Sequence, residues 1–236
     1  MKRKRRAPAS RGGKRSRIQY TTFRAPRRYT STAMVVPGFT RRAGYYKSAG
    51  DGEKKFFDTI LAGTTVGVSG TILSSSLNLI PQGATQNERI GLKCKAVSLH
   101  IRGKVSLDPT ATATDAMDRV RFIVYVDKQA NGAAATAANI LEATVNIDAF
   151  RNLENTHRFR ILADKIYTVA STASDGTTFI RSSRTIKHNI DCSYQLYFDG
   201  ATGAITEVRS NNLGVLAVSE NGDAKASYTA RLRFYG

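Results

Sequence analysis

Apolar and polar side chains alternate along several stretches of the chain after residue 50. In the segment 97–105, every odd-numbered position except a glycine is apolar, and the even-numbered positions are polar or basic. The segments 120–127 and 226–234 show the same period of two, which is typical of strands with one face in a core. Together with weaker candidates, the pattern predicts about eight strands, the others being expected at 54–61, 66–79, 158–169 with a bend near Asp164, 185–198 and 205–218.

Helical patterns are scarce by comparison. Only residues 133–143 are expected to form a helix, as an insertion after the turn-like pair Asn131-Gly132. Parallel strands would need crossover helices, so the strands are expected to pair antiparallel. Long connections at 108–118 and 129–151 favour a jelly roll over a tight up-and-down barrel. The predicted fold class is therefore all-β, an eight-stranded antiparallel jelly-roll sandwich.

Charge divides the chain into two parts. The whole sequence has 36 Lys and Arg against 18 Asp and Glu, a formal net charge of +18. Residues 1–50 carry 15 of the cations and none of the acids, whereas the rest of the chain is close to neutral. We therefore expect a basic, largely disordered N-terminal arm at 1–50 and a folded domain at 51–236, because the arm has little apolar surface to offset its ordering entropy.

The arm has the composition of a segment that binds polyphosphate through counterion release, without selecting a base sequence. Aromatic side chains lie between its basic clusters and could stack on bases, although Phe39, Tyr45 and Tyr46 could equally pack on the folded domain. The expected nucleic-acid-binding residues are Lys2, Arg3, Lys4, Arg5, Arg6, Arg11, Lys14, Arg15, Arg17, Arg24, Arg27, Arg28, Arg41 and Arg42. Eight of them have the pattern of a nuclear localisation signal, namely Lys2, Arg3, Lys4, Arg5, Arg6, Lys14, Arg15 and Arg17.

Several protein classes are disfavoured by the sequence. The uncharged stretch 59–87 is interrupted by polar residues and by Pro81, so we expect no membrane span. The basic opening is not followed by an apolar segment, so a secretory signal is not expected. Cys94 and Cys192 are too few for a disulfide scaffold or a four-ligand zinc site. These features are compatible with reducing cytosol or nucleus.

No catalytic site is evident. His100, His157 and His188 do not share a metal-ligand spacing, and no nucleophile elbow, phosphate-binding loop or paired-carboxylate motif is present. We therefore expect no enzyme activity, no cofactor and no metal, and structural or surface roles for the histidines. An enzyme of cupin type on a jelly-roll scaffold is a rival that would need clustered His and carboxylate ligands.

Two local features leave alternatives open. Cys94 lies between Lys93 and Lys95, which could lower the pKa of its thiol, but a buried inert thiol is the other interpretation. Asp115 and Asp118 could share a calcium ion, or they could simply be solvated on a loop. Neither feature by itself indicates a function.

Three stretches carry a family resemblance. They are SLNLIPQGATQNERIGLKC at 76–94, DRVRFIVYVDKQANGAAA at 118–135 and FRNLENTHRFRILADKIYTV at 150–169, and the closing RLRFYG also fits. With the basic arm, these resemble capsid proteins of small circular single-stranded DNA viruses that encode a replication initiator. The resemblance covers most of the chain. A nuclear or ribosomal nucleic-acid-binding protein with a basic extension remains the alternative.

The resemblance implies a jelly-roll subunit of the circovirus-like or satellite-virus-like type. About sixty copies would form a small icosahedral shell around a circular single-stranded DNA genome, with the arms directed inward. The partners implied are other copies of the chain, the genome and a host nuclear import receptor, with no membrane. The expected locations are the virion and, during assembly, the host nucleus. The arm lacks the Cys/His cluster of some plant-infecting relatives, so metal-assisted DNA binding is not expected.

Overall fold

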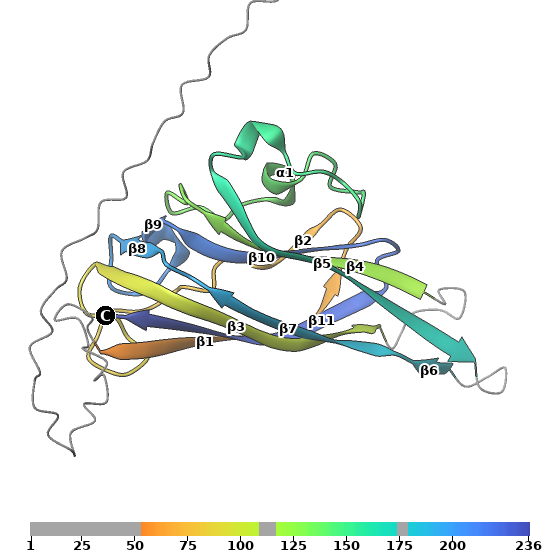
Figure 1. Ribbon diagram of the computed structural model, residues 1–236, viewed down its shortest axis with the longest axis horizontal. Coiled ribbons are helices and arrows are strands. Elements are labelled where there is room, and N and C mark those ends of the chain that lie inside the picture. Colours follow the sequence, from red (N-terminus) through yellow and green to blue (C-terminus); the bar gives the residue numbers. More distant parts are fainter. Residues whose placement is uncertain (1–52, 109–116, 174–178) are drawn as a thin grey trace, which may run out of the picture. The chain divides into compact units, whose positions relative to one another are not determined.

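The computed structural model describes residues 53–108, 117–173 and 179–236 (Figure 1). These residues belong to one compact unit, Lys47–Gly236, and the predicted arm at 1–50 lies outside them. The described residues form eleven strands, one short α-helix and two 3-10 turns. The strands are β1 Lys54–Val66, β2 Thr71–Ser74, β3 Lys93–Leu107, β4 Met117–Asp127, β5 Phe159–Ala173, β6 Phe179–Arg181, β7 Ser183–Asp191, β8 Gln195–Phe198, β9 Val208–Ser210, β10 Asn212–Ser219 and β11 Ala224–Tyr235.

The strands form two antiparallel sheets. The six-stranded sheet has the order β1-β11-β3-β8-β9, with β7 also paired to β3. The five-stranded sheet has the order β2-β10-β4-β5-β6. The first long strand therefore lies beside the last, and the second strand beside the next to last, as in a double-sheet jelly roll. The predicted fold class, an all-β antiparallel jelly-roll sandwich, is confirmed, with eleven described strands in place of the eight expected.

The core lies between the two sheets, which form the two layers visible in Figure 1. Alternation places Phe122 of β4 and Tyr228 of β11 in this layer, where their rings meet edge to face with centroids 5.8 Å apart. The ring of His188 from β7 stacks on Phe122 at 5.7 Å, and its Nε2 lies 3.1 Å from the hydroxyl of Tyr167. Burial lowers the pKa of His188. The ring of His188 is thus part of an aromatic cluster with Phe122 and Tyr167.

The connection between β4 and β5 covers the outer side of the five-stranded sheet (Figure 1). It forms a second apolar cluster in which Ile140 and Leu141 pack with Tyr125 and Leu216 of the sheet. The predicted helix 133–143 is wrong in length, because only α1, Ala137–Ile140, is helical. The helix ends there since Leu141 adopts an extended conformation and is buried in the cluster. Among the described helices, none is long and apolar enough to cross a membrane.

Several predicted strands are interrupted in the structure. The segment expected at 66–79 is interrupted by a turn between Val66, the last residue of β1, and β2. After β2 the chain leaves the strand, and the side chain of Asn78 accepts a hydrogen bond from the backbone N–H of Leu213 at 2.9 Å. The segments expected at 185–198 and 205–218 are each divided into two strands, and a 3-10 turn occupies Ile205–Glu207. The irregularity expected near Asp164 is present as a register shift in the pairing of β5 with β4.

One end of the sandwich is organised around a buried arginine. Arg89, in the connection between β2 and β3, is fully buried. Its guanidinium donates hydrogen bonds to the carbonyls of Ile80 at 3.0 Å, of Gly91 and of Gly200. It also lies over the ring of Phe198, 4.2 Å from the centroid. One side chain thus joins two loops that are more than a hundred residues apart in sequence.

Candidate nucleic-acid interface

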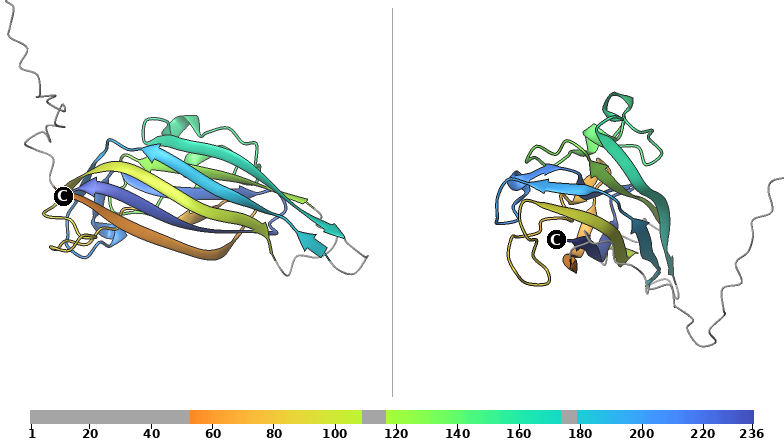
Figure 2. Two further views of the ribbon diagram at one scale, coloured as in Figure 1. Left: turned by 60° about the horizontal axis from the view of Figure 1, so that its bottom comes forward. Right: turned by 60° about the vertical axis from the view of Figure 1, so that its left-hand side comes forward.

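The fourteen arm residues expected to bind nucleic acid lie outside the described residues, and so do the eight expected to form a localisation signal. Their assignment stays a prediction. Within the described residues, several basic side chains lie on the outer side of the six-stranded sheet, as burial and strand register show. The left view of Figure 2 shows the backbone of this sheet most fully. We call this surface the basic face, formed by Lys95, Arg102, Lys104, Lys187, Lys225, Arg231 and Arg233 together with His100.

Strand register explains how these side chains share one surface. In β3 the buried residues Leu99 and Ile101 alternate with exposed or half-buried ones, which therefore point away from the core. Arg231 of β11 is paired with His100, and Lys187 of β7 is paired with Arg102. Directly paired residues of antiparallel strands point to the same side of a sheet. Three strands thus contribute cations to one face.

The centre of the basic face is hollowed. A depression of about 310 Å³ is lined by His100, Arg102, Thr229, Arg231 and Arg233. All five side chains can donate hydrogen bonds, and the three guanidinium groups can each present two donors to one phosphate. The hollow therefore has the chemistry of a phosphate-binding surface.

Two acidic contacts restrain part of this surface. Asp58 of β1 accepts two hydrogen bonds from Arg231, at 2.7 and 2.6 Å, and these bonds raise the pKa of the arginine. The same guanidinium lies over the ring of Phe56, 4.6 Å from its centroid. By contrast, Arg102 and Arg233 have no described carboxylate within ion-pair distance. Among the described residues, neither charge is neutralised by an ion pair.

The sequence indicated part of this interface. The alternation in 97–105 marked Arg102 and Lys104 as side chains opposite the core. The same alternation in 226–234 places Arg231 and Arg233 opposite the core of their own strand. What the sequence did not show is that these two strands are neighbours, because pairing between them depends on the topology of the whole sandwich.

Of the two local alternatives, the one that concerns Cys94 is resolved by the structure. Burial raises the pKa of the Cys94 thiol to about 12, so its lysine neighbours do not activate it. The buried carboxylate of Asp118 accepts hydrogen bonds from the Ser219 hydroxyl at 2.6 Å and from two backbone N–H groups, so it ties the β10–β11 turn to β4. Asp115 lies outside the described residues. Among those described, no group of three or more His, Cys, Asp or Glu could hold a metal ion.

Comparisons with solved structures give capsid chains at low similarity. The chain is similar to one in "Crystal structure of the T13 IBDV viral particle", with 7% identity and a TM-score of 0.26, over 79% of this chain and 32% of that one. A chain of infectious bursal disease virus Gx strain gives 12% identity and a TM-score of 0.26, over 79% and 33%. The 60-mer BFDV capsid protein gives 11% and 0.25, over 77% and 88%.

This chain therefore spans about a third of the length of the first two structures. TM-scores of this size do not establish a common fold, and the fold class is based on the strand order described above. The comparison with curated proteins gives no match.

The family comparison matches most of the chain and shows the family to which it belongs. The family described as Satellite tobacco necrosis virus coat protein matches residues 48–235. This range contains all eleven described strands and both sheets of the jelly roll. The chain belongs to the Satellite tobacco necrosis virus coat protein family.

Proposed function

We propose that this coat protein assembles, in about sixty copies, into a small icosahedral shell that packages a circular single-stranded DNA genome. The observation that carries the proposal is the separation of charge in a member of a coat protein family. Fifteen cations without an acid occupy residues 1–50, and the folded domain adds the basic face. In such a shell the arms and the basic face would be directed inward, and the protein would be structural rather than enzymatic.

The charge balance supports this assignment. Sixty arms with fifteen cations each would supply roughly 900 positive charges, close to half of the phosphates in a genome on the order of two thousand nucleotides. Polyamines and Mg²⁺ would neutralise part of the remainder. The folded domain would add four cations of the basic face, Arg102, Lys104, Arg231 and Arg233.

Expression of the full chain tests the proposal directly. We expect uniform closed particles in negative-stain micrographs, and nucleic acid that resists external nuclease while the particles are intact. Extracted nucleic acid digested by DNase and not by RNase would support a DNA cargo. Absence of closed particles would contradict the shell and would favour the alternative, a nuclear or ribosomal nucleic-acid-binding protein. A cargo of RNA would contradict the genome assignment alone.

The basic face is expected to contribute to binding of single-stranded DNA. Replacing both Arg102 and Arg233 by Glu in the full chain should weaken binding and lower the salt dependence of the affinity by about 1 for each lost phosphate contact. Fluorescence anisotropy over a series of salt concentrations measures this slope. A control with Lys128→Glu and Arg160→Glu, at the end of β4 and on β5 of the other sheet, makes the same change in net charge. Equal slopes for the two variants would contradict a role for the basic face.

Nuclear import is the second function proposed for the arm. Residues 1–28 fused to a fluorescent reporter are expected to bring it to the nucleus, because two basic clusters separated by a short spacer fit the binding surface of an import receptor. The control replaces Lys2, Arg3, Lys4, Arg5 and Arg6 by Gln, which should return the reporter to the cytoplasm. Cytoplasmic retention of the unmodified fusion, seen by microscopy, would exclude this signal.

A further inference from the structure

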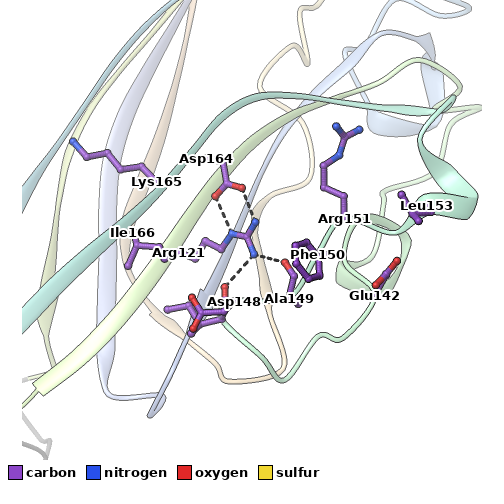
Figure 3. Close-up of a pocket in the computed structure, with 11 residues that line it drawn as sticks. Arg121, Glu142, Asp148, Ala149, Phe150, Arg151, Leu153, Asp164, Lys165 and Ile166 are labelled. Atoms are coloured by element: carbon purple, nitrogen blue, oxygen red, sulfur yellow. Dashed lines mark hydrogen bonds and ion pairs between the residues drawn. The ribbon is translucent and has the colours of Figure 1, made fainter.

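An apolar groove lies on the outer side of the five-stranded sheet, along the part of β5 that forms the edge of this sheet. It has a volume of about 700 Å³ and lies between β4, β5 and the connection that joins them. Figure 3 shows Phe150 near its centre, with Leu153 and Ile166 on either side. These three side chains are 81%, 72% and 39% exposed. Large apolar side chains gathered in this way mark a surface that another molecule covers.

The floor of the groove is held in place before any partner binds. Arg121 of β4 donates two hydrogen bonds to the carboxylate of Asp164, at 2.8 and 2.6 Å. Its remaining nitrogen donates to the carbonyls of Ile147 at 3.0 Å and Ala149 at 2.6 Å. The residues before Phe150 are therefore fixed to the sheet, and covering this groove would cost little ordering entropy.

Charges around the groove indicate what covers it. In Figure 3 the acidic side chains of Glu142 and Asp148 lie on one side of Phe150, and the basic side chains of Arg151 and Lys165 lie on the other. A surface with this arrangement is complementary to itself. Consider a twofold axis that lies in the plane of contact and runs between the acidic and the basic side chains. Rotation by 180° about this axis places the acidic side chains of one copy opposite the basic side chains of the other. Nucleic acid would not be expected here, because the two signs are balanced and the centre is apolar.

We propose that this groove is a contact between two copies of the chain related by a twofold axis that passes close to Phe150. The inference rests on the proposed function in one respect, namely that copies of the chain assemble. In the contact, Phe150 and Leu153 of each copy cover the same residues of the other. Asp148, which pairs with Arg119 of its own copy at 3.3 Å, also faces the partner's Lys165, and Glu142 faces the partner's Arg151.

A cysteine at the axis provides a direct test. Two copies of a residue next to a twofold axis are close to each other, so Phe150→Cys in the full chain should form a covalent dimer when diamide oxidises the purified protein. Nonreducing electrophoresis reads the dimer. The matched control is Ile60→Cys, which replaces another exposed apolar side chain, 77% exposed on β1. The natural Cys94 and Cys192 are each 3% exposed, so they should not react in the folded protein.

The cross-link is measured both on particles and on unassembled protein. A dimer of Phe150→Cys without one of Ile60→Cys supports the contact. Lack of a Phe150→Cys dimer in both preparations overturns it. If the unmodified chain formed no particles, the proposed shell would be contradicted. The presence or absence of the Phe150→Cys dimer in solution would still test the proposed contact. The two failures are therefore distinguishable.

Charge reversal provides a second, independent test. Asp148→Lys and Lys165→Asp should each reduce dimer and particle formation, measured by analytical ultracentrifugation, and the two changes together should restore it. Both side chains are exposed, and the ion pair that Asp148 makes with Arg119 lies at the surface and contributes little to stability. These variants are therefore expected to fold, and circular dichroism verifies this. Normal assembly of both single variants would overturn the proposed pairing across the axis.

Discussion

Removal of residues 1–42 is expected to leave a folded jelly roll that no longer encloses nucleic acid. The deletion takes away fourteen of the 36 cations and lowers the net charge per chain from +18 to +4. The sandwich keeps its core, because both sheets and their apolar clusters are formed by residues after 53. Affinity for a polyanion depends steeply on the number of phosphate contacts, so loss of the arm should abolish encapsidation rather than reduce it slightly.

Sedimentation of purified particles and extraction of their nucleic acid measure this outcome. The matched control exchanges Lys for Arg and Arg for Lys throughout the arm, which preserves every charge. This control should package normally, because counterion release depends on the number of positive charges and not on whether lysine or arginine carries them. Truncated particles that retained a full-length genome would show that the arm is not the packaging element.

The strands most accurately predicted from the sequence are those with one face in the core and one in solvent. The segments 97–105 and 226–234 are found within β3 and β11, where apolar residues are buried at every second position. This pattern survives because the outer face of the six-stranded sheet is polar. In β4 the alternation is weaker, since Ile123 and Tyr125 are buried beneath the β4–β5 connection. The sequence of β4 still indicated a strand, but it did not indicate that the β4–β5 connection forms a second apolar cluster on the outer side of the sheet.

Other features depended on contacts between residues distant in sequence. The short helix and the interrupted strands reflect local conformations imposed by tertiary packing, such as the hydrogen bond between Asn78 and Leu213. The hollow in the basic face requires the pairing of β3 with β11. Likewise, Arg121 fixes the groove floor through carbonyls 26 and 28 residues away. Periodicity describes each element separately and therefore does not specify which elements meet.

Arg89 illustrates the same limit more strongly. Arginine is seldom fully buried, so the sequence favours an exposed position for it. In the structure it is fully buried and supplies donors to three carbonyls that belong to two loops. Burial lowers its pKa, although the group is still expected to remain charged near neutral pH because its ordinary pKa is so high. The run 76–94 that carries the family resemblance includes this residue, but the resemblance did not specify its role.

Arg89→Ala is accordingly expected to destabilise the folded chain by about 2–5 kcal/mol, the range for truncation of a large buried side chain to Ala. The substitution leaves the carbonyls of Ile80, Gly91 and Gly200 without their donor and opens a cavity against Phe198. Arg89→Lys should be intermediate, because a single ammonium group cannot reproduce the planar fork that reaches three acceptors. Denaturant unfolding of the arm-deleted domain measures each change.

The control for this prediction is Arg209→Ala, which removes an exposed arginine paired with Asp199 close to the same loop. A surface ion pair of this kind contributes about 0–1 kcal/mol, so this variant should unfold close to the unmodified protein. If Arg89→Ala lowered the free energy of unfolding as little as Arg209→Ala does, the three carbonyls would have to be hydrogen-bonded by water or other donors at no cost. The claim that the buried guanidinium holds the two loops together would then be wrong. A large difference between the two variants would instead show that the β2–β3 and β8–β9 connections are stabilised as one unit, because the same side chain satisfies both.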